Sequence, residues 1–415
     1  MSALRRLPLS ARRTIVSFTR KPLWNVPSLP SASIPQEERV DEERHPSYNP
    51  KAFYPAKPEE VLDNRYQLLV KVGWGSRSTR PVTVKIINRR RADSPQFEWD
   101  MESLLAEQNP SHRGRSVLRT FTDSFIVNTA EGSHSCLVYK PMRETFNIFQ
   151  RRFVDDKIPL PLVKAYVSVL LWALDYLHSE CHVVHCDLKL DNILMTFEND
   201  TVLPNFLKDQ QPMEFKIDQA TKRPIYRCHN NVGHLQLEDL KEMFPMLADF
   251  GQATRLEQDS PDAGENTEHL GIYPVQSNFY RAPEAILGCG WEFKADIWNF
   301  GVLLWNIVGG TELFTQVLDT NKHYNAKSHL AEMIALLGPP PARLLEKSRD
   351  RIETPWPTAY YNEIGKLCHN TKEFLDGPFF DGEERPRGML AWRPEDRKTA
   401  RELLEHPFLG FAKKP

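Results

Sequence analysis

A glycine turn followed by a strand with a single lysine suggests a site that holds phosphate groups. The turn is formed by 73–76 (GWGS), and the apolar run 82–87 (VTVKII) carries Lys85. Backbone N–H groups can approach a phosphate closely only where side chains are absent. Taken alone, this turn is weak evidence, because many β-turns have a similar composition.

Three further motifs follow in a fixed order along the chain. HCDLKLDNIL (185–194) contains Asp187, Lys189 and Asn192, and LADFGQA (247–253) contains Asp249. YRAPE (280–284) comes next, before ADIWNFG. The ordered set H-x-D-L-K-x-x-N, A-D-F-G and A-P-E is very specific. On these motifs the chain from residue 66 to 409 resembles the eukaryotic protein kinase family.

This resemblance implies phosphoryl transfer from ATP, in which the protein mainly positions groups and neutralises charge. Asp187 would accept the proton of the substrate hydroxyl, and Lys189 would meet the γ-phosphate. Asn192 and Asp249 would bind Mg²⁺, a hard cation that prefers oxygen ligands. A lysine at position 189 is typical of serine/threonine kinases within the family.

The resemblance also implies the residues that surround the nucleotide. Lys85 would bind the α and β phosphates. Tyr139 would lie at the back of the adenine pocket, although it could equally be ordinary core packing. The connector 140–142 would bond adenine through its backbone. The expected nucleotide-binding residues are Val72, Gly73, Trp74, Gly75, Lys85 and Met142.

Lys85 needs an acidic partner from the helix that follows it. The segment FEWDMESLLAEQ (97–108) offers Glu98, Asp100 and Glu102. Glu98 has apolar residues at the plus-three and plus-seven positions, so one apolar helical face lies beneath it. We therefore expect Glu98 to be the partner and Glu102 to be second choice. Either one could instead be a solvent-exposed acid.

Other residues match positions with structural roles in the family. Glu284 of the A-P-E motif would pair with Arg397, and Asp296 would anchor the catalytic loop. Cys186 precedes the proposed base, where regulated kinases usually carry an arginine that binds a phosphorylated loop. Its presence suggests activity without loop phosphorylation, although a small buried residue with no role is the plainer interpretation.

Several stretches are similar to the fungal relatives of the SR-protein kinases, within the CMGC group. They are RYQLLVKVGWGS, NPSHRGR with LRTFTDSF, ALLGPPP, and the YR pair before A-P-E. That subfamily carries an insert before the D-F-G motif, and 196–246 occupies this place as an expected loop-rich spacer. The resemblance implies Arg/Ser-rich substrates, which Glu257, Asp259 and Asp262 of the activation segment could attract.

The segment between Gly75 and Lys85 is unusually short. In the family a second strand and a hairpin turn separate the glycine turn from the lysine strand. Nine residues cannot form two strands of ordinary length at about 3.3 Å per residue, and Pro81 is poor within a sheet. One strand therefore appears absent, which weakens the roof over the phosphates. An ATP-binding pseudokinase scaffold is the alternative function, and a small-molecule kinase is disfavoured by the YRAPE segment.

The elements that must position these residues form an α+β arrangement. Strand signals fill 66–139, with one helix near 98–105. Helical periodicity follows at 159–180, 295–310 and 396–409. We expect a two-lobed protein-kinase fold over 66–409, with a small strand-rich lobe at 66–139, a larger helical lobe at 143–409, and a tail at 410–415.

Composition limits the remaining possibilities. The 415 residues carry a net charge of −2 and six scattered cysteines, so we expect no direct nucleic-acid partner, no disulfide framework and no zinc site. No apolar run is long enough to predict a membrane span. The expected partners are ATP and protein substrates, and nothing demands an oligomer. Residues 1–36 are a basic tail or a transit peptide, and 37–65 are a linker. Location in cytoplasm and nucleus follows from the resemblance, with mitochondria as the alternative.

Overall fold

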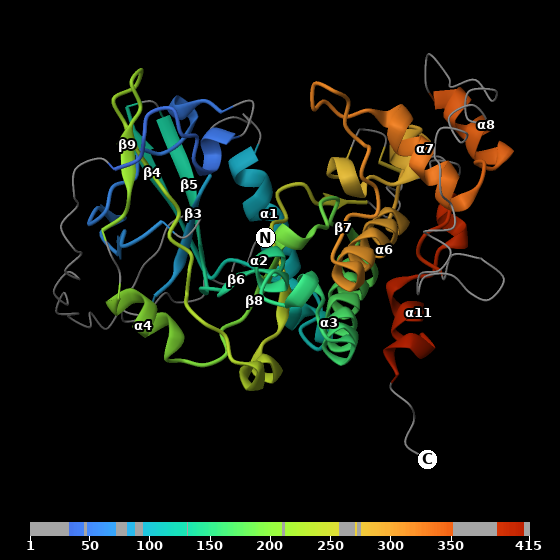
Figure 1. Cartoon of the computed structure of the whole chain (residues 1–415), viewed down its shortest axis with the longest axis horizontal. Helices are drawn as coiled ribbons and strands as arrows, with labels where there is room; N and C mark the ends of the chain where they lie inside the picture. Colours follow the sequence, from blue (N-terminus) through green and yellow to red (C-terminus); the bar gives the residue numbers. More distant parts are fainter. Residues whose placement is uncertain are drawn as a thin grey trace, which may run out of the picture.

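The computed structural model describes residues 33–44, 48–71, 81–87, 94–130, 132–209, 212–256, 270–271, 275–351 and 388–410. It has two lobes (Figure 1). A strand-rich lobe contains β3, β4, β5 and β9, and a larger helical lobe contains α3, α6, α7, α8 and α11. The predicted α+β, two-lobed arrangement is confirmed.

The sheet of the small lobe has the strand order β3-β5-β4 in the described part of the chain. β3 (Thr83–Ile86) and β4 (Asp123–Thr129) both pair antiparallel with the central β5 (Gly132–Tyr139). The register sets Lys85 opposite Leu137. β5 lies in the middle of the sheet, and its last residues are buried. Its pairing with β3 therefore fixes the position of Lys85 in the small lobe.

A second, two-stranded pairing joins β1 (Val61–Leu62) to β2 (Tyr66–Gln67). The chain from residue 68 to 71 then packs against the insert. The glycine turn and the expected missing strand fall on 72–80, outside the described residues. Pro81 lies two residues before β3, so it does not interrupt the sheet.

Helix α1 (Ser94–Glu107) lies between the two lobes in Figure 1. Met101 and Leu105 are buried, as the apolar spacing predicts, and they belong to the main hydrophobic core. The same core continues through the large lobe. That lobe therefore supports the helix that must present an acid to Lys85.

The large lobe is built from helices with short strands at the edge that faces the small lobe. β8 lies between β11 and β6, and β7 pairs with β12. The helices are α2 (Phe146–Gln150), α3 (Leu160–Ser179), α5 (Pro283–Ile286), α6 (Lys294–Gly309), α7 (Ala326–Leu337), α8 (Ala342–Arg351) and α11 (Ala400–Leu404). The strands are β6 (Glu144–Thr145), β7 (Val183–Val184), β8 (Ile193–Met195), β11 (Pro245–Leu247) and β12 (Thr254–Arg255). Short 3₁₀ turns occur at Asp41–Arg44, Pro50–Ala52, Arg113–Val117, Val154–Asp156, Leu190–Asn192, Leu237–Glu242, Asn278–Tyr280, Pro394–Asp396 and Pro407–Leu409.

Two of the predicted helices form the centre of this lobe. α3 is long and apolar enough to pass a length-and-composition test for a membrane span, but most of it is buried inside the protein. α6 is buried along nearly its whole length and ends at Gly310, which adopts φ 70°. This left-handed conformation suits glycine as a helix terminator, so the glycine pair ends the helix as expected.

The continuous helix expected over 396–409 is wrong. Thr399 and Glu402 form a capping box that starts α11 at Ala400. The helix then ends at Leu404, and Pro407 opens a separate 3₁₀ turn. A proline cannot continue a helix because it lacks a backbone N–H, so the apolar residues of this stretch are divided between two short elements.

The insert at 196–246 has more structure than the loop-rich spacer that its composition suggests. It contains α4 (Val202–Lys208) and a hairpin of β9 (Phe215–Ile217) and β10 (Pro224–Tyr226). Leu207, Met213 and Tyr226 bury themselves against Leu69 and Val70 of the small lobe. These apolar residues are far apart in sequence and show no local period, which is why the pattern did not reveal them.

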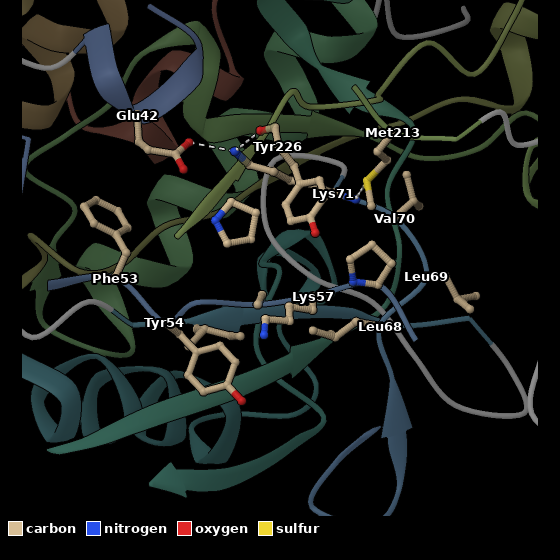
Figure 2. Close-up of a pocket in the computed structure, with 14 residues that line it drawn as sticks. Glu42, Phe53, Tyr54, Lys57, Leu68, Leu69, Val70, Lys71, Met213 and Tyr226 are labelled. Atoms are coloured by element: carbon tan, nitrogen blue, oxygen red, sulfur yellow. Dashed lines mark hydrogen bonds and ion pairs between the residues drawn. The ribbon is translucent and has the colours of Figure 1, made fainter. Parts of the chain in front are cut away.

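Residues 37–65, expected as a linker, are packed against this insert where they are described. Lys71 Nζ contacts Asp41 Oδ2 at 3.2 Å and Glu42 Oε2 at 2.7 Å, and it donates to the carbonyl of Tyr226 at 2.7 Å. The backbone N–H of Lys71 donates to Met213 Sδ at 3.1 Å. Figure 2 shows Glu42, Lys71, Met213 and Tyr226 around a mainly apolar cavity of about 110 Å³. Residues 37–44 therefore contact the insert through Lys71.

Candidate active site

Three polar side chains, two from the loop 185–194 and one from a distant segment, surround Asp187. Lys189 Nζ lies 2.6 Å from Asp187 Oδ2, and Asn192 Nδ2 donates to the same oxygen at 2.9 Å. Ser277 Oγ donates to Asp187 Oδ1 at 2.5 Å. The carboxylate is thus held in one orientation by donors on both oxygens.

Sequence reasoning did not single out Ser277. It lies just before the 3₁₀ turn Asn278–Tyr280, 90 residues after Asp187. A lone serine has no local feature that marks it as a partner of a distant carboxylate. Its position three residues before the YRAPE motif is the only sequence signal that could have drawn attention to it.

Asp296 anchors the loop from below, as predicted. Its side chain is fully buried on α6 and accepts from the backbone N–H of His185 at 2.7 Å and of Cys186 at 3.1 Å. His178 Nε2 contacts the same carboxylate at 2.9 Å. Cys186 has φ 64°, an uncommon conformation for a residue other than glycine. The buried carboxylate therefore stabilises a strained turn directly before Asp187.

Lys85 has the acidic partner that helical spacing favoured. Its Nζ lies 2.5 Å from Glu98 Oε1 and 2.9 Å from Asp249 Oδ1. Burial alone would lower the pKa of Lys85, but the carboxylates of Asp249 and Glu98 outweigh it and raise that pKa. The lysine therefore stays charged. Glu102, the second choice, instead bonds Tyr139 and the backbone of Phe121.

Asn192 and Asp249 lie at the ends of paired strands. The N–H of Ala248 donates to the carbonyl of Asn192 at 2.9 Å, which brings the two candidate metal ligands to one edge. Asp249 has φ 65° and a side chain that is 47% exposed. Burial opposes ionisation of Asp249, but Lys85 outweighs it and lowers the pKa. A charged carboxylate and an amide fit the oxygen ligands that Mg²⁺ prefers.

A cleft of about 420 Å³ lies between the lobes and contains these groups. Lys85, Tyr139, Met142, Asn192 and Asp249 all line it, so the structure gathers these sequence-predicted residues at one site. Residues of the insert also reach this cleft, namely Phe197, Leu203, Phe206, Leu207, Asn230 and Val232. Asp187, Lys189 and Glu98 are not among its lining residues; Asp187 bonds to Asn192, Lys189 to Asp187, and Glu98 to Lys85. The other predicted residues, Val72, Gly73, Trp74 and Gly75, lie outside the described part of the chain.

Two further predictions concern the surroundings of the cleft. Arg397 donates to both oxygens of Glu284, at 2.6 and 2.7 Å, which confirms their pairing. Cys186 is buried and packs into the core, in agreement with the plainer interpretation of that residue. No disulfide joins the cysteines in the described segments. The acids Glu257, Asp259 and Asp262 fall outside those segments.

Comparison with known proteins agrees with this geometry. The model of the protein kinase domain matches residues 230–409. A serine/threonine protein kinase of Aspergillus fumigatus is 32% identical over 93% of this chain and 93% of its own length. This chain belongs to the serine/threonine protein kinase family.

Other relatives refine the placement of this kinase. It is 26% identical to the serine/threonine-protein kinase SRPK of Physarum polycephalum, over 89% of this chain and 92% of that protein. A crystal structure of a kinase domain superposes with a TM-score of 0.58 at 20% identity, covering 86% of this chain and 99% of that one. The first likeness supports the SR-protein-kinase-like affinity, and the second supports the fold.

Proposed function

We propose that this kinase transfers the γ-phosphate of Mg-ATP to serine and threonine residues of Arg/Ser-rich proteins. The observation that carries this proposal is the set of donors around Asp187. Lys189, Asn192 and Ser277 hold its carboxylate ready to accept a proton from a substrate hydroxyl. A base positioned in this way contributes roughly 10²–10⁴-fold to the rate.

The remaining roles follow from charge. Lys85, kept charged by Glu98 and Asp249, would bind the α and β phosphates at the small-lobe side of the cleft. Lys189 would neutralise the γ-phosphate as the hydroxyl attacks. Positioning and charge neutralisation supply most of the catalysis in phosphoryl transfer.

Asn192 and Asp249 would hold Mg²⁺, which when bound neutralises the charge that develops on the phosphates. The adenine would lie toward Met142 and the connector, because Met142 lines the same cleft as Lys85 and Asp249. Lys85 would leave Asp249 in part when the metal enters, since both cations compete for one carboxylate.

The choice of Arg/Ser-rich substrates is supported by the resemblance of the sequence and by the name of the Physarum relative. Glu257, Asp259 and Asp262 would attract arginine side chains. Neutralising all three should raise KM for an Arg-Ser peptide, because the rate of encounter and the affinity both depend on opposite charge. An unchanged KM would remove these acids from substrate docking.

The direct test is transfer of labelled γ-phosphate from Mg-ATP to an Arg-Ser repeat peptide, beside a basic control protein. Asp249→Ala serves as the inactive control. Transfer to serine that disappears in Asp249→Ala supports the proposal. Equal transfer to the basic control protein would retain the kinase and reject the Arg/Ser preference.

An ATP-binding scaffold without turnover is the second candidate, favoured by the short segment between Gly75 and Lys85. Stabilisation by ATP without phosphate transfer would support it. If inserting the missing strand restores transfer, the short segment is the cause.

Location and assembly extend this proposal. The kinase would act as a monomer in cytoplasm and nucleus. A fluorescent fusion of residues 1–40 tests the mitochondrial alternative, which predicts mitochondrial rather than diffuse fluorescence. Sedimentation of the full chain tests the monomer.

A further inference from the structure

Glu102 is a buried acid that has no assigned role in the proposed phosphoryl transfer. It lies one helical turn after Glu98 on α1, and only 1% of it is exposed. Its Oε1 accepts from the hydroxyl of Tyr139 at 2.8 Å, and its Oε2 accepts from the backbone N–H of Phe121 at 2.8 Å. Both oxygens therefore bond to the sheet side of the small lobe.

These two bonds tie α1 to the rear wall of the nucleotide cleft. Tyr139 ends β5, directly before the connector, and it lines the cleft. The guanidinium of Arg119 lies over the Tyr139 ring at 4.4 Å, and Arg119 Nη2 donates to the carbonyl of Lys140 at 3.3 Å. The helix, the rear wall and the first residue of the connector thus form one connected network.

A buried polar network of this kind specifies one helix position. A buried carboxyl that loses its hydrogen-bond partners is destabilised, so displacement of α1 from Tyr139 and Phe121 is opposed. Glu98 and Glu102 are four residues apart, about 6 Å along a rigid helix axis. Any shift that breaks the bonds of Glu102 therefore also moves Glu98 away from Lys85.

We propose that Glu102 is a positioning residue that clamps α1 to Tyr139 and Phe121 and thereby holds Glu98 against Lys85. The clamp rests on the proposed nucleotide site for its effect on ATP. Loss of the clamp reduces the population that is competent to bind, so the apparent affinity for nucleotide falls in proportion.

The charged groups around Glu102 make its protonation part of the clamp. Four charged or titratable groups face Glu102. They are Glu98 on the same helix, Lys85 on β3, Tyr139 on β5, and Arg119 in the segment before β4. Burial, followed by the negative charge of Glu98, raises the pKa of Glu102 to about 7. Bonds from Tyr139 and Phe121 favour the charged form, and such charge-assisted bonds are the stronger ones. Because burial and Glu98 outweigh these bonds, the clamped site disfavours the charged form, so the clamp weakens as pH rises toward 7 and then changes no further.

Three substitutions and one control test the clamp. Glu102→Leu removes both bonds with little change in volume. Glu102→Gln can keep both, because the amide oxygen accepts from Phe121 and the amide nitrogen can donate to the Tyr139 oxygen. Tyr139→Phe removes one bond and leaves the acid. Glu107→Gln, at an exposed position on the same helix, is the control.

The kinetic readout is KM for ATP and kcat between pH 5.5 and 8.5. We expect Glu102→Leu to raise KM roughly tenfold with less than a twofold change in kcat. Glu102→Gln should stay within about twofold at low pH. Its KM relative to the original protein should fall as pH rises and level off above an inflection near pH 7, because only the original protein acquires the disfavoured buried charge. In Tyr139→Phe the inflection should move to higher pH. An unaltered KM in Glu102→Leu, or no inflection, overturns the proposal.

Hydrogen exchange of the α1 amides provides a readout that needs no nucleotide. Glu102→Leu should exchange faster along α1 than Glu107→Gln, and Glu102→Gln should match the original protein. Equal exchange in Glu102→Leu and Glu107→Gln overturns the clamp even if phosphate transfer is never observed. Failure of Mg-ADP to bind the original protein would instead count against the proposed nucleotide site.

Discussion

Arg397 and Glu284 meet through two parallel hydrogen bonds of 2.6 and 2.7 Å, and neither side chain is exposed. Arg397 also donates to the carbonyls of Ala391 and Lys294, at 2.9 Å each. The pair therefore joins the A-P-E segment, the start of α6 and the last part of the chain. Two desolvated charges with all these partners form a structural joint rather than a reactive site.

Removing one member of this pair should destabilise the protein strongly. Arg397→Met leaves the buried carboxylate of Glu284 uncompensated, and such a loss costs about 3–5 kcal/mol. Arg393→Met is the control, because Arg393 pairs with Asp396 at an exposed site where an ion pair contributes little to stability. Urea denaturation of both variants measures the difference. Equal midpoints would contradict the buried pair as a source of stability.

Asp187→Asn should separate catalysis from binding. The amide keeps the shape of the carboxylate but cannot accept the proton, so kcat should fall roughly 10²–10⁴-fold. The Kd for Mg-ADP should change less than about threefold, because Asp187 is not assigned to the nucleotide. Asp200→Asn, at an exposed position in the insert, is the matched control. A kcat that falls equally in both variants would remove Asp187 from the role of base.

Ser277→Ala should lower kcat by a smaller factor. Its hydroxyl donates to Asp187 Oδ1, and a hydrogen bond to a charged group is worth about 1.5 kcal/mol or more, which is roughly tenfold in rate. Ser277→Thr keeps the hydroxyl and should retain most of the rate. Steady-state kinetics at saturating ATP compare the two. If threonine is as impaired as alanine, the hydroxyl is not what matters.

Loss of stability at acidic pH should depend on His329. The side chain is fully buried, contacts the hydroxyl of Tyr324 at 3.0 Å, and has its pKa lowered to about 3 by burial and by Arg281. A lowered histidine pKa gives stability that is complete above about pH 6.5 and is lost as pH falls toward 3. At pH 4 the loss is on the order of 2–3 kcal/mol.

His329→Gln should remove this contribution. The difference in melting temperature between the original protein and His329→Gln should change as pH falls from 7 to 4, in favour of the variant. His323→Gln is the control, because His323 is 81% exposed and belongs to the preceding turn. A difference that does not vary with pH would show that His329 is not the titrating group.

The sequence predicts the residues of the candidate catalytic centre better than the residues that hold them in place. Asp187, Asn192 and Asp249 occur in short motifs whose spacing is fixed by the chemistry, and the apolar face under Glu98 identifies the partner of Lys85. Asp296 is found in the same way, from its place at the start of a buried helix. These signals are local, so a single sequence is enough to show them.

Contacts between distant segments leave no such signal. Ser277 reaches Asp187 across 90 residues, and Lys71 meets Tyr226 across 155 residues. Glu102 was expected only as the second choice of partner for Lys85, because helical spacing does not reveal its contacts with Tyr139 and Phe121. Each of these contacts depends on how the lobes and the insert pack, and that packing is not a property of any short stretch.

Lys71 contacts Asp41 and Glu42 near the start of the chain and Tyr226 of the insert. These contacts support the segment 68–71, which leads into the glycine turn. Lys71 is the last described residue before that turn, and its ammonium is only 16% exposed between Asp41 and Glu42. Lys71→Met leaves both acids without this cation and removes the bond from the ammonium to the carbonyl of Tyr226 (Figure 2). A partly buried pair of this kind should cost about 1–3 kcal/mol.

The segment 68–71 should then move, so KM for ATP should rise while kcat changes little. Lys57→Met is the matched control, since Lys57 lines the same cavity but its side chain is exposed. Thermal melting and ATP titration of both variants measure the two effects. A lower melting temperature with an unaltered KM would limit Lys71 to stability. A higher KM would show that residues 37–44 and the insert help to position the segment that leads into the glycine turn of the nucleotide site. Such support matters in this chain because only nine residues separate Gly75 from Lys85.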